Sequence, residues 1–207
     1  MRKILLQLVH PAFERSRANR ALVDAVRDVD GITVRDMYEA YPDFLIDVAR
    51  EQELLLAHDV IVFQHPLFWY SSPALLKEWQ DLVLEYGFAY GAGGRALEGK
   101  AWMSSITAGG AREAYCAEGS NRFSIRALLR PFEQTARLCH MRFLAPFVTF
   151  GANQTMSPSD YGDVAHRFRL QLESIRDAGQ ELDDLAKLEL VDARRTEGSN
   201  ASGGRQS

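Results

Sequence analysis

The sequence predicts an α/β fold in which helices cover both faces of one parallel sheet. Strand-like runs alternate five times with helix-like segments along the 207 residues, without an internal repeat. The run 59–63 is apolar without interruption, which is typical of a strand buried on both faces. The run 32–36 is shorter and alternates, as an edge strand does. We therefore expect five strands in the order 2-1-3-4-5.

The strands and helices can be placed by their periodicity and by the residues at their ends. Strands are expected at residues 3–9, 32–36, 59–63, 100–106 and 143–150. Helices are expected at residues 17–29, 48–57, 73–85 and 124–140. A last helix is expected from 157 or 159 to about 179, or alternatively on to 190.

Several residues set the expected ends and breaks of these elements. Ser16 should cap the first helix and Ser72 the third, with Pro73 at its first position and Leu82 facing the sheet. Pro131 should kink or divide the fourth helix, and Pro146 indicates an edge or a bulge in the fifth strand. Residues 37–47 show no clear period and are expected to form a packed loop.

Composition limits the class of protein. The chain is 46% hydrophobic and 25% charged, which predicts one folded domain over residues 1–192, with a disordered tail at 193–207. A net charge of −4 without a Lys/Arg block argues against nucleic-acid binding. No apolar run approaches the ~20 residues that span a bilayer, and no signal peptide is evident. Cys116 and Cys139 form neither a disulfide framework nor a metal site, so a cytoplasmic location is expected.

The expected strand order brings three loops together. The order of the strands reverses between strands one and three, and ligands of such sheets bind at that point, beyond the carboxyl ends of the strands. The loops after strands one, three and four should therefore line one crevice.

The loop after strand one has the character of an anion site. A helix N-terminus offers free N–H groups and the positive end of the helix dipole, and polar or cationic side chains reinforce it. The alternative is that Ser16 only caps its helix. The candidate residues are His10, Ser16, Arg17, Ala18 and Asn19.

The loops after strands three and four suit a planar ring. Aromatic side chains can stack on a ring, and glycines let backbone N–H groups approach its polar atoms. The alternative is that Phe68 and Trp69 fill the core and the glycines only turn the chain. Residues 94–101 nearly match the sequence pattern of a phosphate-binding P-loop. They are not one, because they precede a strand, whereas a P-loop follows a strand. The candidate residues are Leu67, Phe68, Trp69, Tyr70, Thr107, Ala108, Gly109 and Gly110.

These segments resemble the flavin-contacting segments of the flavodoxin-like NAD(P)H:quinone oxidoreductase family. Four further stretches resemble one bacterial branch of it, the ancillary subunits of glutathione-regulated potassium-efflux systems. The stretches are residues 41–47, 62–67, 73–79 and 129–133. The resemblance extends over residues 3 to about 178 and implies a flavodoxin-like three-layer sandwich.

The resemblance also implies a cofactor, an activity and partners. It implies a homodimer that binds FMN, rather than FAD, with the phosphate at residues 16–19 and the ring between the other two loops. It implies that NAD(P)H reduces the flavin and leaves, after which a quinone takes the same place. A membrane potassium/proton antiporter is the implied partner, which would place the chain at the inner face of the cell membrane.

Two tyrosines are the catalytic candidates that the resemblance supplies. Tyr115 matches a tyrosine over the flavin, and Tyr90 matches a residue that lines the substrate pocket. Asn121 stands where related mammalian enzymes have a histidine, and Ala108 stands where the family usually has a second threonine. An asparagine cannot exchange a proton near neutral pH, so a histidine-dependent relay is not expected.

Two alternatives to a quinone reductase remain open from the sequence. One is a regulatory subunit of the antiporter in which flavin is mainly structural. The other is a flavodoxin-type electron carrier, against which the aromatic loop at residues 86–99 argues, because carriers need an exposed flavin edge.

Overall fold

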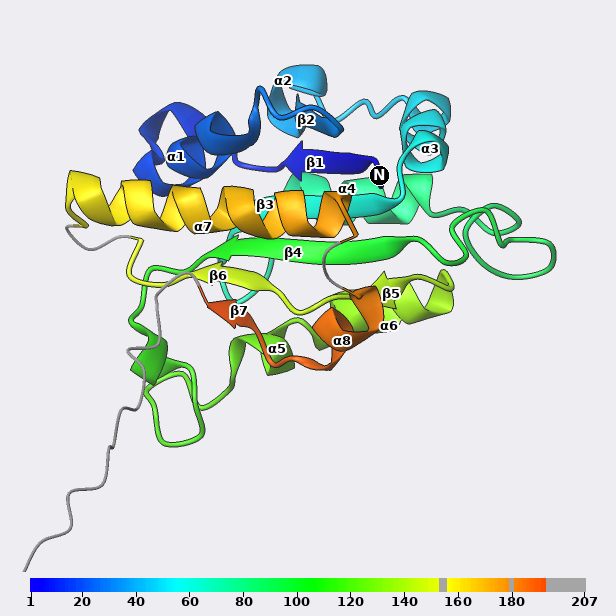
Figure 1. Cartoon of the computed structure of the whole chain (residues 1–207). Coiled ribbons are helices and arrows are strands. Elements are labelled where there is room, and N and C mark those ends of the chain that lie inside the picture. The colour runs from blue at the N-terminus through cyan, green and yellow to red at the C-terminus, as the bar shows by residue number, and fades with distance from the viewer. Residues whose placement is uncertain (153–155, 179–180, 193–207) are drawn as a thin grey trace, which may run out of the picture.

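One parallel sheet forms the centre of the protein (Figure 1). The structure is a computed structural model that describes residues 1–152, 156–178 and 181–192. Every recorded strand pair is parallel, in the order β2-β1-β3-β4-β6-β7, with β5 also paired to β4. The strands are β1 (Ile4–Leu8), β2 (Ile32–Asp36), β3 (Val60–Pro66), β4 (Ala101–Thr107), β5 (Arg142–Phe143), β6 (Phe147–Thr149) and β7 (Val191–Asp192).

The expected fold and strand order are confirmed, and the fifth strand is divided. Its two pieces, β5 and β6, are separated by residues 144–146, which include Pro146. Proline has no N–H group to donate to a neighbouring strand, so the ladder is interrupted there. The carbonyl oxygen of Pro146 accepts a hydrogen bond from the N–H of Val191 at 2.8 Å, where β7 joins the sheet. β7 was not predicted from the sequence.

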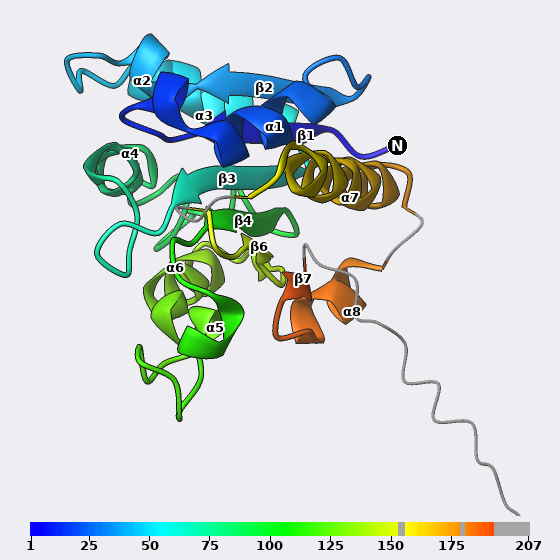
Figure 2. The same cartoon turned by 90° about the vertical axis from the view of Figure 1, so that its left-hand side faces the viewer.

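Helices cover both faces of the sheet, as Figure 2 shows. α1, α7 and α8 pack on one face, whereas α3, α4 and α6 pack on the other. The helices are α1 (Arg17–Val26), α2 (Met37–Ala40), α3 (Val48–Ala57), α4 (Ala74–Val83), α5 (Ile125–Leu128), α6 (Arg130–Leu138), α7 (Pro158–Arg176) and α8 (Leu182–Lys187). Two 3₁₀ turns complete the set, η1 (Phe13–Arg15) and η2 (Arg112–Ala114).

Three expectations about the middle of the chain were wrong. Residues 37–40 form α2 instead of a loop, because the Asp36 carboxylate accepts hydrogen bonds from two N–H groups of its first turn. Ser72 does not cap α4: Pro73 has extended backbone angles and is itself the N-cap. Leu82 is exposed, and Leu76 is buried in its place.

The last helix is shorter than expected. α7 begins after Ser157, whose hydroxyl and Asp160 form a reciprocal capping box, and it ends at Arg176. The left-handed backbone of Ala178, with φ of 58°, lies just beyond this end. The expected disordered tail at 193–207 lies outside the described residues. Within the described ranges, no helix is long and apolar enough to cross a membrane.

A buried carboxylate joins five parts of one face of the sheet. Glu51, on α3, is fully buried, and its oxygens accept hydrogen bonds from four side chains. The donors from Tyr41 and Trp79 lie at 2.8 Å, as does the carboxamide nitrogen of Gln7, and Arg35 forms an ion pair with it. A buried charge is tolerated only with such complete pairing. The network therefore fixes α3 and α4 against β1 and β2.

We expect Glu51→Gln to lower the free energy of unfolding by about 3–5 kcal/mol, because it leaves Arg35 without its charge partner and places an N–H₂ group among donors. Urea titration measures the loss. Glu53→Gln, on the same helix but in an exposed pair with Arg50, is the matched control and should cost about 0.5 kcal/mol or less. Equal effects of the two substitutions would contradict the role of the network.

Candidate functional site

The loops after β1, β3 and β4 meet in one crevice of about 550 Å³, as the strand order predicted. Its volume falls in the range of small-molecule sites. Two arginines and no acidic side chain lie among its lining residues, so the crevice favours an anion. The lining residues are His10, Ala12, Arg15, Ser16, Arg17, Pro66, Leu67, Phe68, Thr107, Gly109, Ala152 and Tyr161.

The start of α1 forms the anion-binding end of this crevice. The Ser16 hydroxyl accepts a hydrogen bond from the N–H of Asn19 at 3.3 Å, so Ser16 does cap the helix. In the described part of the chain, the N–H groups of Arg17 and Ala18 have no recorded partner, and the side chains of Arg15 and Arg17 form no recorded ion pair. Free N–H groups at a helix N-terminus and unpaired guanidinium groups together suit a phosphate. Capping and anion binding are therefore compatible here.

His10 contributes a neutral ring to the crevice. The N–H of Ala12 donates to its Nδ1 at 3.0 Å, which leaves the proton of the neutral ring on Nε2. Burial lowers the pKa of His10, and a backbone hydrogen bond opposes this in part. The ring meets the edge of Phe68, with centroids 6.0 Å apart. His10 can thus offer one N–H donor to a bound ligand.

The loop after β3 has an unusual backbone. Trp69 and Tyr70 both have positive φ angles, of 49° and 63°, and Phe68 and Ser71 close the turn with a 2.9 Å backbone hydrogen bond. Left-handed backbone costs roughly 1–2 kcal/mol for a residue with a side chain. The turn leaves the Trp69 side chain 94% exposed and the Phe68 side chain 44% exposed, so neither residue fills the core. Leu67 and Phe68 line the crevice, whereas Trp69 and Tyr70 stand outside its lining.

Tyr115 and Asn121 connect this turn to the loop after β4. The hydroxyl of Tyr70 donates to the Asn121 side-chain oxygen at 3.3 Å, and the Asn121 side chain is also hydrogen-bonded to Tyr115. Burial raises the pKa of Tyr115 above its ordinary value, although hydrogen bonds to Gly110 and Asn121 oppose the rise. The phenol therefore stays protonated at neutral pH and can act as a donor.

The other predicted residues lie behind the crevice or away from it. Ala18 and Asn19 are buried in α1, and Ala108 is fully buried against the core. Gly110 lies outside the lining, next to the Tyr115 ring. Tyr90 lies between α4 and β4, in a segment that Figure 1 shows at the amino end of β4, opposite the crevice. One chain does not bring Tyr90 to the crevice, and its substrate role stays a prediction.

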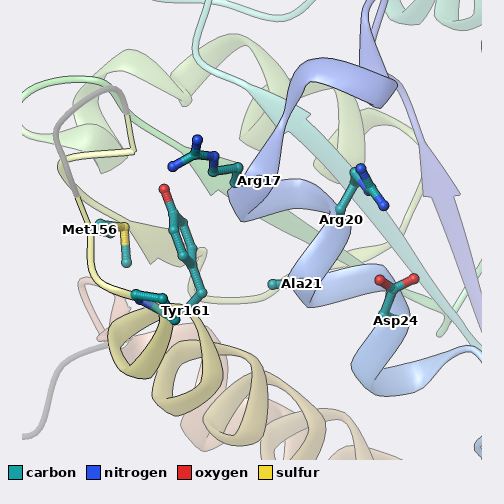
Figure 3. Close-up of a pocket in the computed structure, with 7 residues that line it drawn as sticks. Arg17, Arg20, Ala21, Asp24, Met156 and Tyr161 are labelled. Atoms are coloured by element: carbon teal, nitrogen blue, oxygen red, sulfur yellow. The ribbon is translucent and has the colours of Figure 1, made fainter.

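Five lining residues were not among the predicted site residues. Ala12, Arg15 and Pro66 lie in the loops that were predicted to line the crevice, whereas Ala152 and Tyr161 come from segments that were not. Ala152 follows β6, which also ends at this edge of the sheet, so the strand order could have indicated it. Tyr161 lies in the first turn of α7, and no sequence signal pointed to it. Figure 3 shows Tyr161 and Arg17 pointing toward one another across an adjoining cavity of about 460 Å³. Both residues line both cavities, so the second cavity adjoins the anion-binding end.

His65 belongs to the protein interior. It is fully buried on β3, its Nδ1 lies 3.0 Å from the carbonyl oxygen of Pro66, and its ring packs near Phe132. Burial lowers the pKa of His65 to about 4. His65 therefore supports the end of β3 as a neutral side chain and does not face the crevice. No cluster of metal-ligating side chains occurs in the residues that the structure covers.

The fold and the crevice together define the class. A parallel sheet of this order, with an anion-binding helix start and two loops suited to a ring at its carboxyl edge, is that of flavodoxin-like proteins. The chain belongs to this family: a family model described as a flavodoxin-like fold matches residues 2–172. The resemblance noted from the sequence motifs is thereby confirmed.

The chain is similar to curated bacterial proteins over most of its length. It is 47% identical over 174 residues to general stress protein 14 of Bacillus subtilis, covering 84% of this chain and 97% of that protein. It is 51% identical over 152 residues to the glutathione-regulated potassium-efflux system ancillary protein KefG of Yersinia enterocolitica, covering 73% and 83%.

Solved structures agree with these similarities. General stress protein 14 of Treponema denticola, in complex with FMN, has a TM-score of 0.77 and 37% identity, covering 86% of this chain and 99% of that one. A protein of P. pentosaceus described as an NADPH-quinone reductase has a TM-score of 0.73 and 30% identity, covering 84% and 97%.

We expect His65 to make the fold sensitive to acid. The unfolded chain takes up a proton on this histidine near pH 6.5, whereas the folded chain does so only near pH 4. Stability should therefore fall as the pH drops from 6.5 to 4, by up to about 3 kcal/mol from this group. Urea titrations at several pH values should show that His65→Gln removes this part of the decline. Exposed His166→Gln is the control, and an unchanged pH profile in His65→Gln would refute the assignment.

Proposed function

We propose that this protein is an FMN-dependent NAD(P)H:quinone oxidoreductase. The observation that carries the proposal is the crevice itself, which joins an anion-binding helix start to two loops that can enclose a flat ring. An elongated ligand with a phosphate at one end and a ring at the other fits this distribution of charge and apolar surface. FMN has this form, and it is preferred to FAD as the cofactor.

The residues of the chain support FMN binding at both ends. Arg15, Arg17 and the N–H groups at the start of α1 would hold the phosphate. Leu67 and Phe68 would contact the ring from one loop, and Thr107 with Gly109 from the other. The absence of acidic side chains among the described lining residues avoids repulsion of the phosphate. The fit is therefore electrostatic as well as steric.

The protein would position the flavin, donate hydrogen bonds to it and exclude water from the site. The bound flavin would supply two-electron hydride transfer from NAD(P)H to a quinone. His10 would offer its Nε2 proton, and backbone N–H groups near Gly109 would stabilise negative charge on a ligand. Tyr115 lines another cavity and not the crevice, so its phenol, which is hydrogen-bonded to Gly110, would reach a ligand only from beside the loop after β4. Asn121 does not titrate near neutral pH, so these roles include no proton relay through that residue.

The relatives support the same proposal. One neighbour was solved with FMN, and another is described as an NADPH-quinone reductase. By analogy with the KefG proteins, we propose that this chain is ancillary to a membrane potassium/proton antiporter at the cytoplasmic face. We also propose that it is a homodimer.

The second candidate function is a regulatory subunit in which flavin is mainly structural. Ala108 is fully buried and has no hydroxyl for a ligand, and Asn121 cannot exchange a proton near neutral pH. Both residues reduce the chemistry available at the crevice without reducing its capacity to bind.

One spectroscopic experiment separates the two functions. The protein is loaded with FMN and mixed anaerobically with NADPH and, separately, NADH. Loss of the visible flavin absorption, reversed by a quinone, is the expected outcome for the reductase. A flavin that binds but stays oxidised with both nucleotides would favour the regulatory subunit. No uptake of FMN would eliminate both functions.

We expect Arg17→Ala to weaken FMN binding about tenfold, because one charge-assisted hydrogen bond to the phosphate is lost. Riboflavin has no phosphate, so its affinity should hardly change. Fluorescence titration of the two flavins measures both. Arg27→Ala, just beyond the far end of α1 at a residue paired with Asp24, is the control. Equal weakening of both flavins by Arg17→Ala would place the phosphate elsewhere.

A further inference from the structure

A single buried side chain joins the two ends of the crevice. Asn19, which is 1% exposed, lies on α1 behind the crevice wall. Its Nδ2 donates to the hydroxyl of Ser16 and to the hydroxyl of Thr107, both at 2.9 Å. Ser16 belongs to the anion-binding end and Thr107 to the loop after β4. The relative position of these two ends therefore depends on the orientation of the Asn19 carboxamide.

Gln64 determines that orientation. This residue is fully buried on β3, and its Nε2 donates to the Asn19 carbonyl oxygen at 3.0 Å and to Oδ1 at 3.2 Å. If the Asn19 carboxamide turned over, its N–H₂ group would face the N–H₂ group of Gln64. Two donors facing one another in a buried site would leave both unsatisfied. Gln64 thus holds Nδ2 of Asn19 toward the crevice.

The local energetics indicate that Gln64 is not there to stabilise the fold. Among the described residues, the Oε1 atom of Gln64 is buried and has no hydrogen-bond partner. The hydroxyl of Ser105, the residue paired with Gln64 on β4, is also buried without a partner. A buried polar atom without a partner costs about 1–3 kcal/mol, a cost that an apolar side chain of similar size would avoid. The two hydrogen bonds to Asn19 are what this glutamine provides.

We propose that Gln64 is a positioning residue that couples the two ends of the crevice through Asn19. It touches no ligand, and its effect reaches the ligand only by fixing Ser16 relative to Thr107. The coupling is a property of the chain itself. Only its consequence for flavin binding rests on the proposed function.

Gln7 is a matched control for Gln64. It is also fully buried, lies on the neighbouring strand β1, donates through Nε2 to a single acceptor residue, Glu51, and has an unpartnered Oε1. Its side chain, however, faces the opposite side of the sheet from the crevice network. Gln7→Met and Gln64→Met therefore make the same chemical change at two buried glutamines on opposite faces of the sheet, one bonded to the charged Glu51 and one to the neutral Asn19.

The first measurement is amide hydrogen exchange of the protein without flavin. In Gln64→Met, exchange should rise about tenfold both at Asn19 and at Ala108, because the link between α1 and the end of β4 is lost. In Gln7→Met, exchange at these two amides should stay within about twofold of the unchanged protein. A rise at only one end, or the same rise in both variants, would overturn the coupling.

The second measurement is FMN affinity in a double-mutant cycle. Gln64→Met should weaken FMN binding about tenfold. Gln7→Met should leave the FMN affinity unchanged, even if it lowers the free energy of unfolding more than Gln64→Met does. If Gln64 acts through Asn19, the double variant should bind FMN as Asn19→Ala does, within about twofold. Additive losses, or normal affinity in Gln64→Met, would refute the positioning role. Should the unchanged protein take up no FMN, the proposed function fails, and the exchange data still decide the coupling.

Discussion

The common direction of the strands is the constraint on which the crevice depends. Every recorded pairing is parallel, so all the strands run toward the same edge of the sheet. The chain passes from β1 outward to β2 and returns to β3 on the other side of β1. α1 therefore covers one face and α4 the other, and neither closes the edge between them. The loops that could bind a ligand converge there because no helix can fill the gap.

Two buried polar networks lie behind this arrangement, one on each face of the sheet. On the α3 side, the charge of Glu51 is fully paired and fixes helices to strands. On the α1 side, Asn19 and Gln64 are neutral and lie directly behind the crevice. The first network lies on the opposite face of the sheet, and none of its residues lines the crevice, so its role is structural. The second connects segments that each face the ligand, so its geometry is transmitted to the site.

Much of the fold could be predicted from sequence because it rests on local patterns. The apolar run of β3, the Ser16 cap and the edge-like β2 each follow from a few neighbouring residues, and together they predicted the strand order. The failures have a different cause. β7 is two residues long and exists only through its pairing with β6, and α2 depends on the Asp36 cap in a segment without periodicity. Neither leaves a pattern that a window of sequence can detect.

The sequence by itself determined the fold class, the convergence of three loops and the kind of chemistry that each loop could bind. Tertiary structure alone decided which side chains line the crevice: it placed Trp69 in solvent, left Tyr90 outside the lining and brought Tyr161 into it. It also placed the carboxamide of Gln64 against Asn19. The physical reason is that backbone periodicity is set by near neighbours, whereas the direction of a side chain is set by residues distant in the chain.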